Sequence, residues 1–125
     1  MVKQVSVFQP GSVQTAAGAR PLLNEERLSE EEQALVGAYL EAGAVVMHTT
    51  ARGIDILRND EQVVPMTIRT DGEYVWTGPV TYYVQTHGVA PDPGFLEYVR
   101  ARNYKNRVPD EAEVHAAAQV FTPGR

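Results

Sequence analysis

The strongest folding signals in this chain lie in residues 63–102, VVPMTIRTDGEYVWTGPVTYYVQTHGVAPDPGFLEYVRAR. The pair Asp71-Gly72 predicts a tight hairpin turn, because these residues readily adopt the positive φ angles that such turns need. After the turn, Tyr74 and Trp76 share one face of the return strand, because side chains alternate along a strand. This segment therefore predicts a β-hairpin with an aromatic face.

Two helices are expected to follow this hairpin. Gly78-Pro79 opens the first helix, since proline is favoured near a helix start. Gly88 ends it, since glycine readily takes a left-handed conformation. Asp92, followed by Pro93, is expected to cap a second helix that continues to about Arg102.

Short strands are expected before the hairpin. Residues 44–47 form a compact apolar run, and Ile54 and Ile56 alternate with Asp55, which is typical of strands. Arg52-Gly53 and Asn59-Asp60 are expected to form turns. The resulting order is a helix, about four strands and three helices. This order predicts an α+β fold, with a small antiparallel sheet and helices packed on one face.

The first helix carries an N-terminal capping signal. Ser29 precedes three glutamates, and Glu32 takes the third helical position, which is the pattern of a capping box. Gly43 is expected to end this helix in a left-handed conformation.

The last helix carries the same signal. Asp110 and Glu113 have the spacing of a capping box, and Val108 and Val114 are spaced as a hydrophobic staple.

We expect residues 1–125 to form a single domain, because a chain of this length can bury a hydrophobic core. Residues 1–27 are expected to contribute a short strand and an arm. The segment 9–21 is small and polar, so we expect the arm to be irregular.

Composition limits the classes of function. The chain has no cysteine, which excludes disulfides, thiol nucleophiles and cysteine-ligated metals. Its net charge of −5 argues against a general nucleic-acid binder, which needs a basic face. We find neither a signal-peptide pattern nor an apolar run of membrane-spanning length, so the cytoplasm is the expected compartment.

No catalytic or cofactor-binding motif is present in the sequence. It contains no Gly-x-Ser-x-Gly, no phosphate-binding glycine loop and no His-Glu-x-x-His. His48, His87 and His115 are far apart, so their spacing indicates no metal site. His87 is expected to sit at a helix C-terminus, which favours positive charge. We therefore expect no catalytic residue, no metal and no cofactor.

The aromatic residues suggest a binding surface. Tyr82 and Tyr83 are adjacent on a helix and point about 100° apart. We expect Trp76 and Tyr83 in the core, and Tyr82 and Arg69 as an exposed pair. Tyr74, placed across the hairpin from Arg69, is the third binding candidate. Tyrosine, tryptophan and arginine dominate interface hot spots.

Two alternatives stay open. His48, Arg52 and Asp55 surround one expected turn and, with Arg69, could line the polar pocket of a small enzyme or ligand-binding protein. Pro65 indicates an edge strand, which together with the N-terminal arm could support self-association.

The motifs of the central segment also carry a resemblance. They are Val64-Pro65, Thr70-Asp71-Gly72, Trp76, Tyr82-Tyr83 and His87-Gly88. This pattern resembles a module of small actinobacterial proteins and covers about a third of the chain. The resemblance implies no catalytic residues, and it implies a companion of larger multidomain or toxin-type systems.

We therefore expect a non-enzymatic, cytoplasmic bacterial protein that is immunity-like or accessory. Its partner is expected to be another protein, rather than nucleic acid or a membrane. Binding is expected to use the aromatic and arginine surface.

Overall fold

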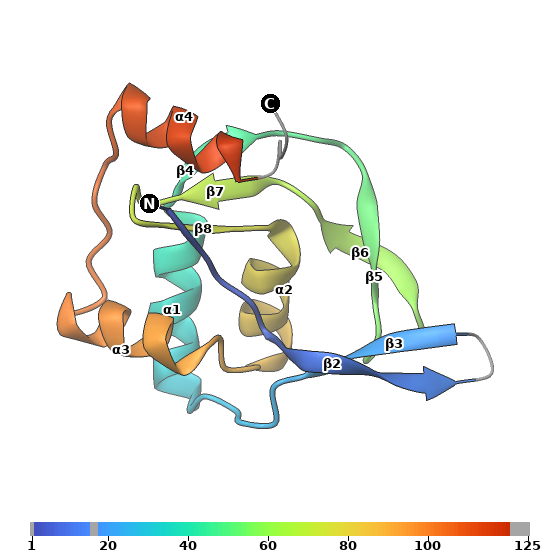
Figure 1. Ribbon diagram of the computed structural model, residues 1–125. Helices are drawn as coiled ribbons and strands as arrows, with labels where there is room; N and C mark the ends of the chain where they lie inside the picture. The colour runs from blue at the N-terminus through green and yellow to red at the C-terminus, as the bar shows by residue number, and fades with distance from the viewer. Residues whose placement is uncertain (1, 16–17, 121–125) are drawn as a thin grey trace.

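The computed structural model describes residues 2–15 and 18–120 (Figure 1). Its strands are β1 (Lys3–Gln4), β2 (Phe8–Thr15), β3 (Gly18–Leu23), β4 (Ala44–Met47), β5 (Arg52–Asp55), β6 (Glu61–Pro65), β7 (Ile68–Thr70) and β8 (Tyr74–Trp76). Its helices are α1 (Glu30–Glu41), α2 (Gly78–His87), α3 (Pro93–Ala101) and α4 (Glu111–Gln119). The predicted α+β class is confirmed.

A mixed four-stranded sheet has the strand order β1, β8, β7, β4. Strand β7 is antiparallel to both of its neighbours, whereas β1 runs parallel to β8. The sheet is therefore not wholly antiparallel, because β1 joins it from the distant N-terminal part of the chain. The turn at Asp71-Gly72 is confirmed: Gly72 has a φ of 100°, and the Asp71 amide donates to the Tyr74 carbonyl at 3.2 Å.

Side chains alternate along β8, so the two faces of the central sheet pack into two different hydrophobic clusters. Trp76 is fully buried with Tyr83 on the side of α1, α2 and α3, as predicted. Val75 points to the other face and packs with Ile68 of β7 and Ala117 of α4. Figure 1 shows α4 across the sheet from α1 and α2. The expectation of helices on one face is wrong for α4, which shields the second apolar face from water.

The N-terminal arm has regular structure. Residues 9–21 were expected to be irregular, but β2 and β3 form an antiparallel hairpin with a register shift between Phe8 and Ser12. Its tip at residues 16–17 lies outside the described residues. The small and polar residues of this segment gave no strand signal, and its prolines are compatible with strands because each strand of a two-stranded ribbon has an outer edge that tolerates a missing N–H.

The segment 61–70 forms two strands. Strand β6 ends at Pro65 and pairs with β5 in a separate two-stranded sheet, whereas β7 starts at Ile68 and joins the central sheet. Arg52-Gly53 was expected to be a turn but begins β5. The turn at Asn59-Asp60 is confirmed, with φ angles of 57° and 59°.

Helix α1 shows half of the predicted capping box. The Ser29 hydroxyl accepts from the Glu32 amide at 3.1 Å, but the Glu32 carboxylate receives two hydrogen bonds from Arg100 instead of reaching back. Gly43 does not adopt the left-handed conformation; a Cβ there would lie 2.6 Å from the Trp76 ring, so glycine is needed for close packing.

The predicted N-terminal caps of α4 and α3 have different outcomes. Helix α4 has the complete capping box of Asp110 and Glu113. Val108 forms no staple, because it is 93% exposed. Asp92 makes no side-chain cap for α3. Its carboxylate instead accepts from the Ser6 amide at 2.9 Å, which joins the N-terminal segment to α3.

The N-terminus of α2 lies directly against the end of β6. A Cβ placed on Gly78 would lie 1.8 Å from the carbonyl oxygen of Pro65. Gly78 therefore allows a backbone approach that no other residue permits without movement of the helix.

We expect Gly78→Ala to lower the free energy of unfolding by about 3 kcal/mol, because the added methyl group displaces α2 from β6. Urea denaturation measures this change. Gly94→Ala is the matched control, because nothing lies within 4 Å of a Cβ there. The control should be neutral or stabilising by up to about 1 kcal/mol. Equal effects of the two substitutions would contradict the close approach.

Candidate functional site

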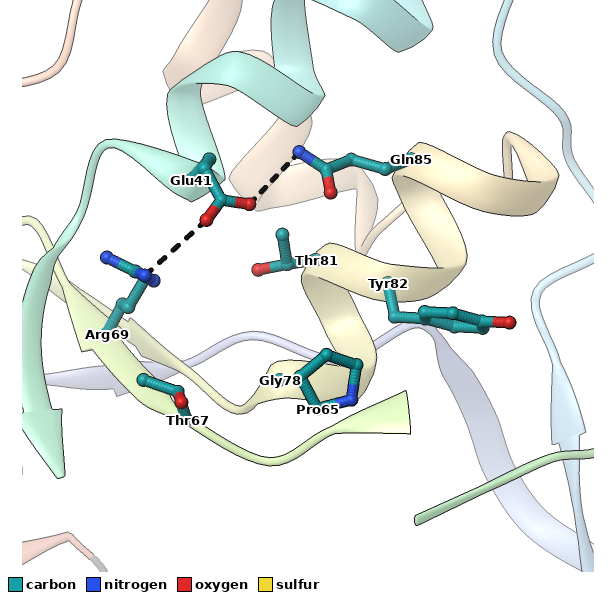
Figure 2. A pocket seen from close by; sticks show the side chains of 8 residues that line it. All are labelled: Glu41, Pro65, Thr67, Arg69, Gly78, Thr81, Tyr82 and Gln85. Atoms are coloured by element: carbon teal, nitrogen blue, oxygen red, sulfur yellow. Dashed lines mark hydrogen bonds and ion pairs between the residues drawn. The ribbon is translucent and has the colours of Figure 1, made fainter. Parts of the chain in front are cut away.

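A small surface pocket lies where α1, β7 and α2 meet the end of β6 (Figure 2). Its volume is about 110 Å³. The residues that line it are Glu41, Pro65, Thr67, Arg69, Gly78, Thr81, Tyr82 and Gln85. We call it the Arg69 pocket. Drug-sized ligands and cofactors occupy roughly 300–1,000 Å³, so this pocket suits a single amino-acid side chain.

Among the described residues that line the pocket, Arg69 is the only cation, and two contacts hold its guanidinium. Its Nη1 donates to the Gly43 carbonyl at 2.9 Å, and its Nη2 lies 3.5 Å from Oε2 of Glu41. The Arg69 side chain is 24% exposed and that of Glu41 is 57% exposed. A guanidinium has five N–H donors, so donors beyond those directed at Gly43 and Glu41 can serve a ligand.

Glu41 connects the two sides of the pocket. Its Oε1 accepts from Nε2 of Gln85 at 3.3 Å, while its Oε2 faces Arg69. Figure 2 shows the carboxylate between these two side chains. Because both contacts are long and Glu41 is largely exposed, an incoming group can displace this carboxylate at low cost.

Tyr82 forms another part of the wall and was expected to be largely exposed. The structure shows it half-buried, with its hydroxyl donating to Oδ2 of Asp55 at 2.6 Å. Figure 2 shows the hydroxyl pointing away from Arg69. Tyr82 and Arg69 therefore share the pocket through the tyrosine ring, whereas the hydroxyl belongs to a second polar cluster.

Asp55 is the centre of that second cluster and is fully buried. Besides Tyr82, its carboxylate contacts Nε2 of His87 at 2.7 Å and the Leu57 amide at 2.8 Å. Burial raises the pKa of Asp55, but the hydrogen bonds from His87, Tyr82 and Leu57 outweigh it and hold the pKa below its ordinary value. The ionised carboxylate thus joins the β5–β6 hairpin to α2.

The remaining predicted site residues lie elsewhere. His48 is exposed beside the pocket, with Nδ1 3.5 Å from Oγ1 of Thr67. Arg52 is exposed, and its Nη1 donates to backbone carbonyls of its own loop. Tyr74 packs against Phe95, with ring centroids 5.0 Å apart. Arg69 lies opposite Trp76 in the β7–β8 register, instead of opposite Tyr74 as expected.

The proposed polar pocket of His48, Arg52, Asp55 and Arg69 is therefore not assembled as expected. Each of the four side chains has different contacts, and only Arg69 lines the pocket. Asp55 meets His87, the histidine that sequence reasoning assigned to the helix C-terminus. Their separation of 32 residues gave no sequence signal.

Three residues that line the pocket were not predicted from the sequence: Glu41, Thr81 and Gln85. The sequence contained a signal for two of them: Thr81 is three residues after Gly78, and Gln85 is four residues after Thr81. Residues with this spacing lie on one helix face, so a stripe of small and polar residues on α2 could have been predicted from the sequence.

No family model, curated protein or solved structure matches the chain. Among the described residues, no helix is long and apolar enough to span a membrane. No group of three or more His, Asp or Glu in that part of the chain is placed to hold a metal ion.

We expect Tyr82→Phe to lower the free energy of unfolding by about 1.5 kcal/mol, because a buried carboxylate loses a charge-assisted hydrogen bond. Tyr74→Phe is the control, since no described residue accepts a hydrogen bond from the Tyr74 hydroxyl. The control should change stability by less than about 0.5 kcal/mol. Urea denaturation at neutral pH measures both variants, and equal losses would contradict the assigned role of the Tyr82 hydroxyl.

We also expect Asp55 to contribute to acid unfolding. Its folded-state pKa is lowered, so its stabilisation is present above the unfolded-state pKa of about 3.9 and is lost as pH falls through the folded-state value. Asp55→Asn should therefore destabilise the protein at neutral pH and flatten the decline of stability below about pH 4. Denaturation midpoints recorded across this range test the expectation. Parallel pH profiles of variant and wild type would contradict it.

Proposed function

We propose that this chain is a protein-binding domain whose partner inserts a side chain into the Arg69 pocket. The observation that carries the proposal is a partly exposed guanidinium in the wall of a pocket sized for one side chain. Arginine and tyrosine at the centre of a contact contribute most to binding free energy. The proposed partner surface is the pocket and its rim.

The fixed positions of the two main residues support the proposal. Arg69 is held by the Gly43 carbonyl and Tyr82 by the Asp55 carboxylate. Side chains that are already ordered lose less conformational entropy on binding. Binding therefore requires no rearrangement of Arg69 or Tyr82, and Glu41 is the wall residue that moves.

The chemistry of the pocket favours an anchor with acceptor oxygens. Arg69 supplies only donors, and the hydroxyls of Thr67 and Thr81 can also donate. A carboxylate or amide side chain of the partner would accept from Arg69 and move Glu41 aside. The proposed anchor is thus Asp, Glu, Asn or Gln.

The resemblance described above bears on the kind of partner. It implies an accessory or immunity-like role beside a larger multidomain or toxin-type protein, and we propose such a protein as the partner, in the cytoplasm. Proteins encoded next to this chain are therefore the first candidates to co-express with it.

We expect Arg69→Ala to weaken partner binding at least tenfold, about 1.4 kcal/mol, because the anchor loses its charged donor. The measurement is a titration of the purified pair by calorimetry, with the partner taken from co-expression and identified by native mass spectrometry. Arg52→Ala is the matched control: Arg52 is exposed, and within the described part of the chain its side chain bonds only to carbonyls of its own loop.

The control should bind like the wild type. Equal losses for the two arginines, or no loss for either, would contradict the pocket as the contact surface. Unfolding curves of each variant establish that binding is compared between folded proteins.

A further inference from the structure

Strand β4 is the last strand of the central sheet, and its outer side pairs with no other described strand. Its sequence, Ala-Val-Val-Met, has no charge and no proline. Proteins usually protect such an edge with lysine, proline or a covering segment. Val45 and Met47 are instead 47% and 49% exposed.

The hydrogen-bond pattern shows which backbone groups face outward. The Val75 carbonyl accepts from the Val5 amide at 3.0 Å, so the groups of Val75 point toward β1. Thr70 is the antiparallel partner of Val75, so the backbone N–H and C=O of Thr70 point toward β4. There Thr70 lies opposite Ala44. Because the direction alternates along a strand, the N–H and C=O of Val45 point away from β7.

We infer that two copies of this chain pair antiparallel through β4, about a two-fold axis at Val45. A residue with both groups directed outward can exchange two hydrogen bonds with its own copy. Each chain carries a net charge of −5, but the paired strands are apolar and uncharged. Pairing through β4 therefore places no like charges opposite each other within the strands. Pairing also covers Val45, which is otherwise exposed to water.

The geometry also sets the strength and the form of this dimer. The register shift between Val45 and Met47 limits the new ladder to a few residues, so we expect a dissociation constant on the order of 10 μM. A two-fold axis at right angles to the sheet places both Arg69 pockets on the same face. The dimer does not depend on the proposed partner, and it would give that partner two adjacent contact sites.

Cysteine cross-linking tests the register directly. The chain has no cysteine, so Val45→Cys introduces a single thiol. Hydrogen-bonded antiparallel pairs have Cα atoms about 5.5 Å apart, a distance that a disulfide spans. Mild oxidation of Val45→Cys should give a covalent dimer at least tenfold faster than Val63→Cys, a control residue on β6 that is 38% exposed. Equal rates would overturn the inference.

Sedimentation equilibrium tests the association itself. Wild type should be a monomer–dimer mixture at about 10–200 μM. Val45→Pro removes the outward N–H and leaves the ladder to β7 intact, so it should weaken dimerisation at least tenfold. Val63→Ala should dimerise like the wild type. A monomeric wild type at about 200 μM, or a Val45→Pro variant that dimerises normally, would overturn the inference; if Val45→Pro does not fold, the cross-linking rates decide.

Discussion

The position of α2 against the β5–β6 hairpin determines both the fold around the site and the site itself. Gly78 allows the start of α2 to touch the Pro65 carbonyl. The Asp55 carboxylate receives Tyr82 from the middle of the helix and contacts His87 at its end. These contacts come from the two strands of one hairpin. Helix α2 is therefore held along its length, and the face that lines the Arg69 pocket has a defined position.

This arrangement explains why the pocket is small and polar. The aromatic residues of the central stretch mostly face inward: Trp76 and Tyr83 are buried, and Tyr74 packs on Phe95. At the pocket, α2 presents one tyrosine ring with a threonine and a glutamine. The charge comes from β7 and from the end of α1. A binding surface of this composition suits one polar anchor more than a broad apolar contact.

Local signals in the sequence predicted local structure well. The Asp71-Gly72 turn, the Asp110 capping box and the burial of Trp76 each follow from neighbouring residues. The errors arose where a side chain contacts a residue far away in the sequence. The Glu32 carboxylate accepts from Arg100, 68 residues away, instead of completing the capping box. The Asp55 carboxylate contacts His87. Such pairings depend on the packing of whole elements, which periodicity and spacing do not encode, so of the predicted site only Arg69 and Tyr82 were brought together at the pocket.

The central claim is that the partner binds at the Arg69 pocket. Amide hydrogen exchange, followed by mass spectrometry with and without the co-expressed partner, tests it most directly. Our account predicts slower exchange in residues 65–69 and 78–85 of the complex, with little change in α4 on the opposite face of the sheet. Protection confined to α4, or to the β2–β3 hairpin, would contradict it.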